Sequence, residues 1–435
     1  MSEDGDGLRW LEVLRDFEGD RTGDIPSLDS LRKLLDCIGD PQNHYRAIHI
    51  AGTNGKGAVA HFASVLGMRS GFSVGTYTSP DLGDLCERIR LNLEPITQGQ
   101  LDAELSSLRM IGEAFEIAGL TKFEVLTAAA LSLFSLEGIE LGVVEVGMGG
   151  AWDATNVVDA EVAVITSVGL DHQEYLGSTV EAIAEVKSGI IKEGSTVIVG
   201  PVSQSVETVL LTAAQRSEVA EIHWVGYDLV VQSQSMAVGG WVCEFQTPYG
   251  TYSDIFVSGH GRHHVQNALI AIGSVEALER GPLPREVVED AMRYQTLRGR
   301  LQVASREPLV VVDVAHNPDA ARAVSSTLAE EFSHVDGWVV LFGLARGRES
   351  EPFLRALNPS TIDELFVIEA PGSRADLVEV AHEASLLGIR SHLASSVDDT
   401  MNQVLATVRK DQGVLVIGGH GLAGQALEFL RRTLP

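Results

Sequence analysis

The chain has 435 residues, 45% of them hydrophobic, and its 60 acidic and 32 basic residues give a formal net charge of −28. This length is typical of two or three domains, and the apolar fraction excludes a disordered chain. The acidic balance disfavours non-specific binding to nucleic acid or to an anionic membrane. Three cysteines, an acidic first segment without a signal-peptide pattern and no apolar run long enough for a bilayer favour a cytoplasmic protein.

The first informative segment is the glycine-rich stretch GTNGKG at residues 52–57, which follows an expected strand at 47–51 and precedes an expected helix. Glycines permit a tight turn whose N–H groups point at phosphate oxygens at a helix N-terminus, and Lys56 adds a positive charge. The generic phosphate-loop pattern is not met, because Ile50 replaces its first glycine and Gly57 replaces its Ser or Thr. A glycine turn without a ligand therefore stays open as an alternative.

Three polar side chains lie at or near the ends of further expected strands. Ser79 follows one strand, Glu145 lies inside the apolar strand 142–146, and His172 follows the strand 161–167. A carboxylate inside an apolar strand is costly unless it is paired or metal-bound. The trio predicts a Mg²⁺ site if it shares a sheet edge with the phosphate loop, although histidine is an unusual Mg²⁺ ligand and each residue also has a structural explanation.

Two further features have ordinary explanations. Lys187 lies near a helix end marked by Gly189, where a solvated lysine would complement the helix dipole. The HGRHH segment at 260–264 contains three histidines, but capping and a ligand contact from Asn267, which lies off the apolar face of the next helix, explain it better than zinc.

Strands and helices alternate along the rest of the chain, with strands expected at 308–314, 338–342, 364–368 and 413–417 and more alternating, antiparallel ones at 239–245 and 251–257. Continuous apolar strands separated by helices predict parallel sheets covered on both faces. We expect an α/β protein. A P-loop-type parallel-sheet ATPase domain with a small antiparallel β extension would occupy residues 1–298, and a smaller Rossmann-like α/β domain residues 299–435.

These motifs together resemble the folylpolyglutamate synthase and dihydrofolate synthase family, which is similar to the Mur ligases. The resemblance runs from residue 25 almost to the C-terminus, and its motifs occur in family order. They are HIAGTNGKG (49–57), YTSP (77–80), ERIRLN (87–92), KFEVLTAAAL (122–131), VEVGMGG (144–150), WDATNV (152–157), GLDHQEYLG (169–177), KSGIIK (187–192), HVQNA (264–268), RGRL (298–301) and DVAHNPDAA (313–321).

The resemblance implies a site that binds ATP and two Mg²⁺ ions, and it assigns residues to each ligand. ATP would contact Asn54, Gly55, Lys56, Gly57, Ala58, Asn267, Arg300 and Asp313. The metal ligands would be Ser79, Glu145, His172 and Lys187, the last as a carbamylated lysine. The catalytic residues would be Lys56, Lys187 and His316. The pterin or folate would contact Lys122, Phe123, Glu124, Asp153, Ala154 and Thr155, with the segment 25–27 joining them.

The implied activity is ATP-dependent addition of L-glutamate to dihydropteroate, to reduced folates or to both, through an acyl phosphate, with release of ADP and phosphate by a monomer. A Mur-type ligase for another carboxylate and a non-catalytic nucleotide-binding protein are the alternatives. The chain departs from the family pattern at Ala58, Asp81, Ala151 and Val314, and again at 346–349. Asp81 and Ala151 lie in segments expected near the acceptor, so acceptor specificity would change there.

Overall fold

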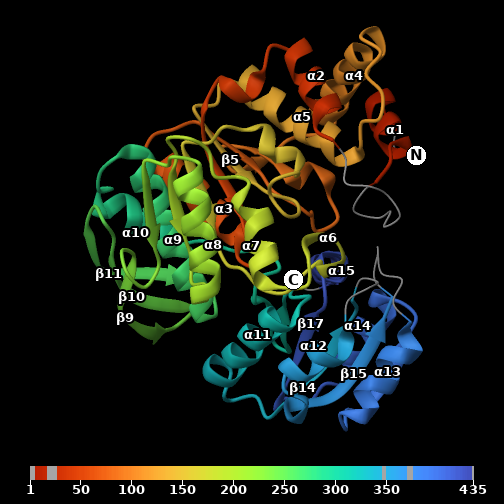
Figure 1. Cartoon of the computed structure of the whole chain (residues 1–435). Coiled ribbons are helices and arrows are strands. Elements are labelled where there is room, and N and C mark those ends of the chain that lie inside the picture. Colours follow the sequence, from red (N-terminus) through yellow and green to blue (C-terminus); the bar gives the residue numbers. More distant parts are fainter. Residues whose placement is uncertain (1–4, 17–26, 345–348, 370–375, 434–435) are drawn as a thin grey trace.

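The computed structural model describes residues 5–16, 27–344, 349–369 and 376–433, so residues 25–26 and 346–348 of the segments named above lie outside the described residues. An eight-stranded and a three-stranded sheet form the N-terminal part, and a six-stranded sheet forms the C-terminal part. Figure 1 shows the C-terminal part, in cyan and blue, below the N-terminal part. Two α/β units with mixed, mainly parallel sheets confirm the predicted fold class.

The eight-stranded sheet has the order β4-β3-β2-β5-β1-β6-β7-β8. Its strands are β1 (Arg46–Ala51), β2 (Val74–Tyr77), β3 (Ile89–Leu91), β4 (Glu94–Pro95), β5 (Leu141–Glu145), β6 (Val162–Ile165), β7 (Thr196–Val199) and β8 (Glu221–Trp224). Strands β2, β5, β1, β6, β7 and β8 pair in parallel, which brings their carboxyl ends to one edge. Strands β3 and β4 continue the sheet in antiparallel pairing and were not predicted.

Helices cover both faces of this sheet. They are α1 (Asp6–Val13), α2 (Asp29–Cys37), α3 (Lys56–Arg69), α4 (Gln98–Ala114), α5 (Lys122–Leu136), α6 (Gln173–Leu176), α7 (Val180–Ser188), α8 (Gln204–Arg216), α9 (Arg262–Glu279) and α10 (Arg285–Arg293). Apolar side chains of α3, α9 and α10 form one core, and those of α1, α2, α4 and α5 form the core on the opposite face. In the described parts of the chain, no helix combines the length and the apolar character needed to cross a membrane.

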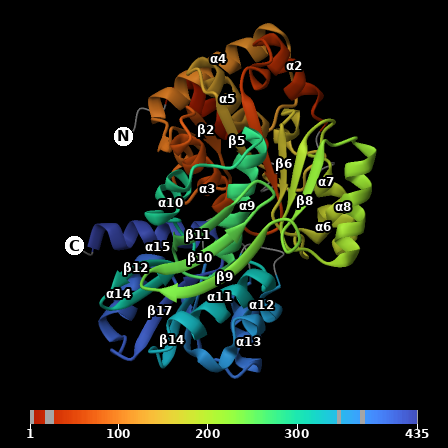
Figure 2. The ribbon, with the colours of Figure 1, turned by 90° about the vertical axis from the view of Figure 1, so that its left-hand side faces the viewer.

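The predicted antiparallel extension is present. It consists of β9 (Val230–Ala237), β10 (Gly240–Gln246) and β11 (Thr251–Ser258), paired in the order β11-β10-β9. Alternate residues of this sheet, such as Trp241, Cys243 and Phe245, are buried against α9. Figure 2 shows the extension in front of α9 and above the C-terminal part.

The C-terminal sheet has the order β12-β13-β17-β14-β15-β16, and only its edge strand β12 is antiparallel. Its strands are β12 (Gln302–Arg306), β13 (Leu309–Val312), β14 (Gly337–Phe342), β15 (Ile362–Ile368), β16 (Ser391–Ala394) and β17 (Gln412–Ile417). The helices are α11 (Pro318–Glu331), α12 (Ser350–Ala356), α13 (Leu377–Leu386), α14 (Val397–Thr407) and α15 (His420–Thr433). Helices α11, α12 and α13 cover one face, and α14 and α15 cover the other, as expected for a Rossmann-like unit.

Candidate active site at the phosphate loop

The GTNGKG segment connects the end of β1 to the start of α3. Gly55 precedes the helix with a φ of 89°, a conformation that favours glycine. A Cβ on Gly55 would lie 2.6 Å from Asn267 Oδ1, so the loop packs directly against α9. Hydrogen bonds from Asn54 N to Ser167 Oγ (2.9 Å) and from Thr166 Oγ1 to Asn54 O (2.7 Å) hold its other side. The loop is therefore fixed on two sides, with the start of α3 free to face a ligand.

Two lysine side chains converge on this loop. Lys56 Nζ and Lys187 Nζ donate to the same carbonyl oxygen, that of Gly52, at 3.2 and 2.9 Å. Lys187 is 4% exposed, so the expectation of a solvated lysine was wrong. Burial, with the charge of Lys56 beside it, lowers the pKa of Lys187 to about 7, against the opposite influence of Asp171 and Asp153. Much of this amine is therefore neutral near pH 7.

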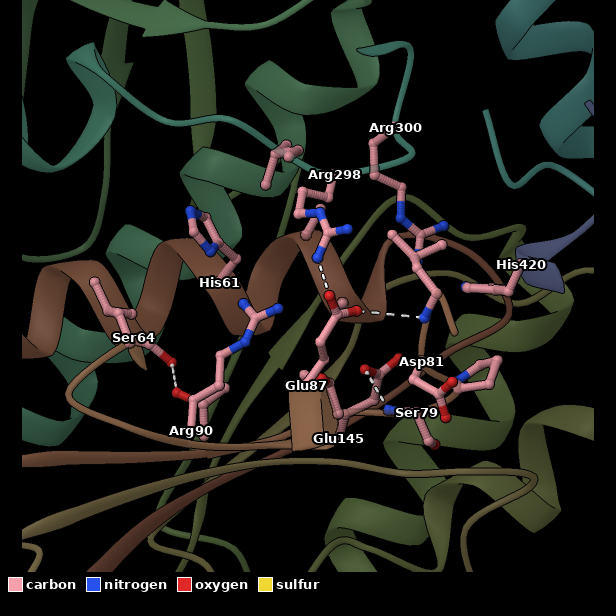
Figure 3. Close-up of a pocket in the computed structure, with 18 of the residues that line it drawn as sticks. His61, Ser64, Ser79, Asp81, Glu87, Arg90, Glu145, Arg298, Arg300 and His420 are labelled. Carbon is pink, nitrogen blue, oxygen red and sulfur yellow. Dashed lines mark hydrogen bonds and ion pairs between the residues drawn. The ribbon is translucent and has the colours of Figure 1, made fainter. Parts of the chain in front are cut away.

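Ser79 and Glu145 meet beside the loop, as Figure 3 shows. Ser79 N donates to Glu145 Oε2 at 3.3 Å, and the buried Ser79 Oγ has no hydrogen-bond partner in the described part of the chain. Burial raises the pKa of Glu145, while Lys56 and Arg300 act to lower it. A Cβ on Gly57 would lie 3.3 Å from Arg300 Nη2 and 3.4 Å from Glu145 Oε2. Gly57 therefore permits the close approach of both side chains.

The third predicted metal ligand, His172, lies at the start of α6 in the left-handed conformation, with a φ of 48°. Its ring lies 3.9 Å from Asp171 Oδ1 and is partly exposed. The structure thus joins Ser79 to Glu145 directly and gives His172 a neighbouring carboxylate. Across the ranges that the structure describes, no three or more His, Cys, Asp and Glu side chains are arranged as a metal site, the HGRHH histidines included.

A hydrogen-bond network joins the phosphate loop to the C-terminal part. Asn54 and Asn317 exchange hydrogen bonds between their side-chain amides at 3.2 and 3.0 Å. Asn317 Nδ2 also donates to Asp171 Oδ2 at 3.2 Å, and His316 Nε2 lies 3.6 Å from the same carboxylate oxygen. His316 Nδ1 lies 2.9 Å from Val314 O, which fixes the ring. The predicted catalytic His316 therefore lies within one network with the loop.

Arg300 and Asp313 lie together where the two parts of the chain meet. The Asp313 carboxylate accepts hydrogen bonds from Leu301 N and Ala315 N, both at 2.7 Å. Burial raises the pKa of Asp313, and the charge of Arg300 acts to lower it. Asp313 therefore holds the turn that carries Arg300.

The predicted acceptor residues are held by their own local contacts. The Phe123 ring stacks on Tyr77, with ring centroids 6.1 Å apart. Glu124 forms a capping box with Thr121 at the start of α5, which uses its Oε2, whereas its buried Oε1 has no partner among described residues. Lys122 is the first residue of α5, and its N–H donates to Arg15 O at 2.9 Å.

Asp153, Ala154 and Thr155 form the start of a short 3-10 helix, Ala154–Val157, with Asp153 as its N-cap. The Asp153 carboxylate accepts from Met148 N (2.8 Å) and Thr155 N (3.0 Å), and Thr155 Oγ1 also donates to it. His49 lies in β1, the strand that leads into the phosphate loop, and its Nε2 is 2.8 Å from Thr155 Oγ1. Burial raises the pKa of Asp153, although these hydrogen bonds oppose the shift. This short helix therefore links the predicted acceptor segment to the loop.

The departures from the family pattern have definite surroundings. The Asp81 carboxylate accepts a hydrogen bond from Arg88 Nε at 2.7 Å; burial acts to raise its pKa, but Arg88 prevails and the pKa of Asp81 is lowered. Ala58 is buried in α3, and Val314 N donates to Gly299 O at 2.9 Å. Ala151 lies against Gly189, where a Cβ would be 2.4 Å from it. The side chain at position 151 therefore packs next to the end of α7.

Sequence reasoning missed Asp171, Asn317 and His420. Asp171 and Asn317 lie within segments that were singled out, GLDHQEYLG and DVAHNPDAA, but the neighbouring histidines drew attention instead. Asn317 also caps α11, where its Oδ1 accepts from Ala320 N at 3.0 Å, and the Asn-Pro pair was a local signal for that cap. His420 begins α15 beside the site, and burial keeps its pKa well below the usual value.

The chain matches the Mur ligase middle domain over residues 50–275 and the Mur ligase, glutamate ligase domain over residues 299–420. The chain is therefore a ligase of the Mur class, in which the glycine-rich loop with its two lysines on one carbonyl precedes a second α/β unit.

A Mycobacterium tuberculosis protein named dihydrofolate synthase/folylpolyglutamate synthase is 36% identical over 392 residues, which cover 86% of this chain and 80% of that protein. The structure of Mycobacterium tuberculosis folylpolyglutamate synthase complexed with ADP is similar with a TM-score of 0.89 and 33% identity, covering 97% of both chains. E. coli FolC in complex with DHPP and ADP has a TM-score of 0.84 and 27% identity, covering 98% of this chain and 97% of that one. The chain belongs to the folylpolyglutamate synthase/dihydrofolate synthase family.

Proposed function

We propose that this chain is an ATP-dependent ligase that adds L-glutamate to dihydropteroate, to reduced folates or to both, releasing ADP and phosphate. The observation that carries the proposal is the convergence of Lys56 and Lys187 on the Gly52 carbonyl at the start of α3. A helix N-terminus with the Lys56 amine beside it suits a polyphosphate, and the buried Lys187 amine lies next to that position. The ADP and DHPP bound by the E. coli relative and the names of the relatives support these substrates.

In this proposal, the loop and its neighbours bind ATP. The backbone N–H groups of Gly55, Gly57 and Ala58 would surround the phosphates next to Asn54, and Lys56 would give them a positive charge. Asn267 contacts the loop on one side and Arg300 approaches it on the other, so both are placed to contact the nucleotide. Asp313 would hold the Arg300 turn through its two backbone hydrogen bonds.

The residues beside the loop fit Mg²⁺. Ser79 Oγ is buried and unpartnered among described residues and adjoins the Glu145 carboxylate, and hard cations prefer such oxygen ligands. We assign one ion to Ser79, Glu145 and His172, and a second to a carbamylated Lys187. Bound Mg²⁺ would offset the repulsion between the triphosphate and the carboxylate of the acceptor.

Lys187 is suited to carbamylation. With a pKa of about 7, roughly half of the amine is neutral at neutral pH, whereas an ordinary lysine is almost entirely protonated. The neutral nitrogen would form a bond to the carbon of CO₂ and release one proton to solvent. The product is a carboxylate group on Nζ of Lys187. In the unmodified lysine, this Nζ lies 2.9 Å from the Gly52 carbonyl oxygen.

The ligation itself requires an activated carboxylate. Transfer of the γ-phosphate to the acceptor carboxylate breaks the bond to ADP and forms an acyl phosphate. The glutamate amine then attacks the acyl carbon, loses a proton and expels phosphate as the amide forms. Lys56 stabilises the charge on the transferred phosphoryl group. The His316 ring, held by Val314 O and Asp171, orients groups beside this phosphoryl group.

We also propose that the protein acts as a cytoplasmic monomer on small molecules, without a nucleic-acid or membrane partner, and that its domains divide at 298/299. The net charge of −28 disfavours polyanionic partners, and the three free thiols suit a reducing compartment. Light scattering should give a mass near 46.6 kDa for the monomer, and twice that mass would contradict it.

Product analysis tests the proposed activity. The protein is incubated with Mg-ATP, L-glutamate and either dihydropteroate or a reduced folate, and the pterins are analysed by mass spectrometry. A product heavier by one glutamyl residue, formed only with ATP, supports the proposal. Failure with both acceptors, together with ligation of another carboxylate, would favour a diverged acceptor site, for which the Asp81–Arg88 pair is the structural indication.

A further inference from the structure

A cavity of about 130 Å³ lies on the side of α3 that faces the β2–β3 hairpin. It begins beside Ser79 and Glu145 and continues along the helix face that carries Ala58, His61 and Ser64. The segment 296–300 closes its outer side, as Figure 3 shows for Arg298 and Arg300. Its volume exceeds the roughly 30 Å³ that a water molecule occupies in the liquid, so it admits a group as large as a carboxylate or phosphate.

Arg90 lines this cavity and is half-buried. In the β2–β3 register it pairs with Thr76, whose hydroxyl lies 2.7 Å from Ser64 Oγ of α3. Directly paired residues share a face of the sheet, so Arg90 also faces α3, and Figure 3 shows its guanidinium next to His61. Arg90 Nε is buried without a hydrogen-bond partner in the described ranges, and burial lowers the pKa of Arg90.

Two other charged groups of the cavity have bonded partners: Arg298 pairs with Glu87, and Asp81 pairs with Arg88. Arg300, at the other end of the cavity, interacts with Glu145 through charge.

The remaining neighbours of Arg90 do not neutralise it. His61 Nε2 lies 2.8 Å from Gln295 Oε1, and burial, reinforced by Arg90, lowers the pKa of His61 although Gln295 opposes the shift. Glu94, on the next strand, acts on Arg90 only through its charge and is itself exposed. Arg90 is therefore a half-buried cation whose buried Nε has no bonded counter-charge among the described residues.

We propose that Arg90 binds an oxyanion, a carboxylate or a phosphate, in the cavity between α3 and the β2–β3 hairpin. A buried guanidinium nitrogen without a hydrogen-bond partner is unfavourable, and the planar fork of arginine matches both kinds of oxyanion. The Thr78 hydroxyl lines the same cavity and can donate a further hydrogen bond, whereas Ser64 Oγ already donates to Ala60 O and is bonded to Thr76 Oγ1. The existence of this site does not rest on the proposed function.

The source of the oxyanion does rest on the proposed function, because the cavity opens beside Ser79 and Glu145. A ligase that consumes glutamate and releases phosphate offers two sources, a carboxylate of the amino acid or glutamyl tail and inorganic phosphate. Both are small, anionic and present at the reaction centre, so each is tested separately.

Calorimetric titration of the nucleotide-free protein with inorganic phosphate, and separately with L-glutamate, tests the site at constant ionic strength. The Lys56→Ala background removes the lysine charge of the phosphate loop. We expect Arg90→Met in this background to weaken binding of at least one probe by about tenfold or more, the effect of a lost charged hydrogen bond. The probe affected identifies the source.

Arg109→Met is the matched control, because Arg109 pairs with Glu113 on the surface of α4 and its side chain is 40% exposed. It should change neither affinity by more than about twofold. Equal affinities in Arg90→Met and Arg109→Met for both probes, or no binding of either probe to the parent protein, would overturn the proposal.

If Arg90→Met does not fold, Arg90→Lys replaces it. This variant keeps the charge but loses the fork, so binding should weaken measurably, and unchanged affinity for both probes would contradict the assignment. Oxyanion binding and ATP-dependent ligation are measured separately, so a failure of this site is distinguishable from a failure of the proposed ligase.

Discussion

Asn317 connects three segments that are distant in sequence, so its removal tests how the two parts of the chain are held together. Its amide exchanges hydrogen bonds with Asn54 of the phosphate loop at 3.0 and 3.2 Å and donates to Asp171 at 3.2 Å. Its Oδ1 also caps α11 by accepting from Ala320 N at 3.0 Å. The residue is 3% exposed, so water does not replace these bonds easily after truncation.

The expected cost of Asn317→Ala follows from these contacts. Loss of an N-cap costs about 1 kcal/mol, and each hydrogen bond between neutral groups contributes about 1 kcal/mol. The bond to the Asp171 carboxylate contributes about 2 kcal/mol, and Asp171 remains buried after its donor is lost. Because these contributions are not fully additive, we expect the free energy of unfolding to fall by about 3–4 kcal/mol.

Urea unfolding, followed by far-UV circular dichroism and tryptophan fluorescence, measures this change and shows whether the two parts unfold together. Asn402→Ala, on the exposed surface of α14, is the control and should change stability by less than about 0.5 kcal/mol. Asn317→Asp keeps the cap acceptor but places a carboxylate beside Asp171. Equal stability of Asn317→Ala and the control would refute the reasoning.

Three further predictions concern the reaction and its surroundings. Lys56→Ala should lower ATP turnover by about 100-fold or more, since it removes the charge beside the phosphates; near-normal steady-state turnover would refute the phosphate-loop assignment. Lys187→Ala should lose activity that added short carboxylates partly restore, and ¹³C NMR with labelled bicarbonate should show a carbamate signal only in the parent protein; a fully active variant would contradict carbamylation. Asp81→Asn should lower stability in urea by about 1–3 kcal/mol at neutral pH, because a charged hydrogen bond to Arg88 is lost. The pKa of Asp81 is lowered in the folded state, so this contribution is complete above the ordinary carboxyl range and is lost as pH falls through the lowered value. A stability difference between Asp81→Asn and the parent protein that persists in strong acid would contradict the stabilising role of the Asp81–Arg88 pair.

The parts of the fold that the sequence predicted are those with local signals. The apolar strands before the phosphate loop and before Glu145, and the helices between them, follow from periodicity alone. The hairpin edge β3–β4 was missed because its strands have three and two residues and carry charged side chains such as Arg90. Such a strand is recognisable only when its partner β2 is known.

The candidate site shows the same limit. The residues around Lys187 alone indicate a solvated lysine at a helix end, and only the family resemblance implied a metal ligand; its hydrogen bond to Gly52 joins it to a residue 135 positions away in the sequence. Asp171 was overlooked beside His172, because a carboxylate in a loop has no signature until Asn317 and His316 approach it from the C-terminal part. Long-range contacts of this kind decide the environment of a side chain, and a single sequence does not contain them.

The most direct test of the proposed function is ADP release by the purified protein with Mg-ATP and L-glutamate, measured with dihydropteroate, with a reduced folate and without an acceptor. The account predicts that at least one acceptor stimulates ADP release and that omission of L-glutamate abolishes amide formation. ATP binding without stimulation by either acceptor would contradict the assignment of a folate-type substrate.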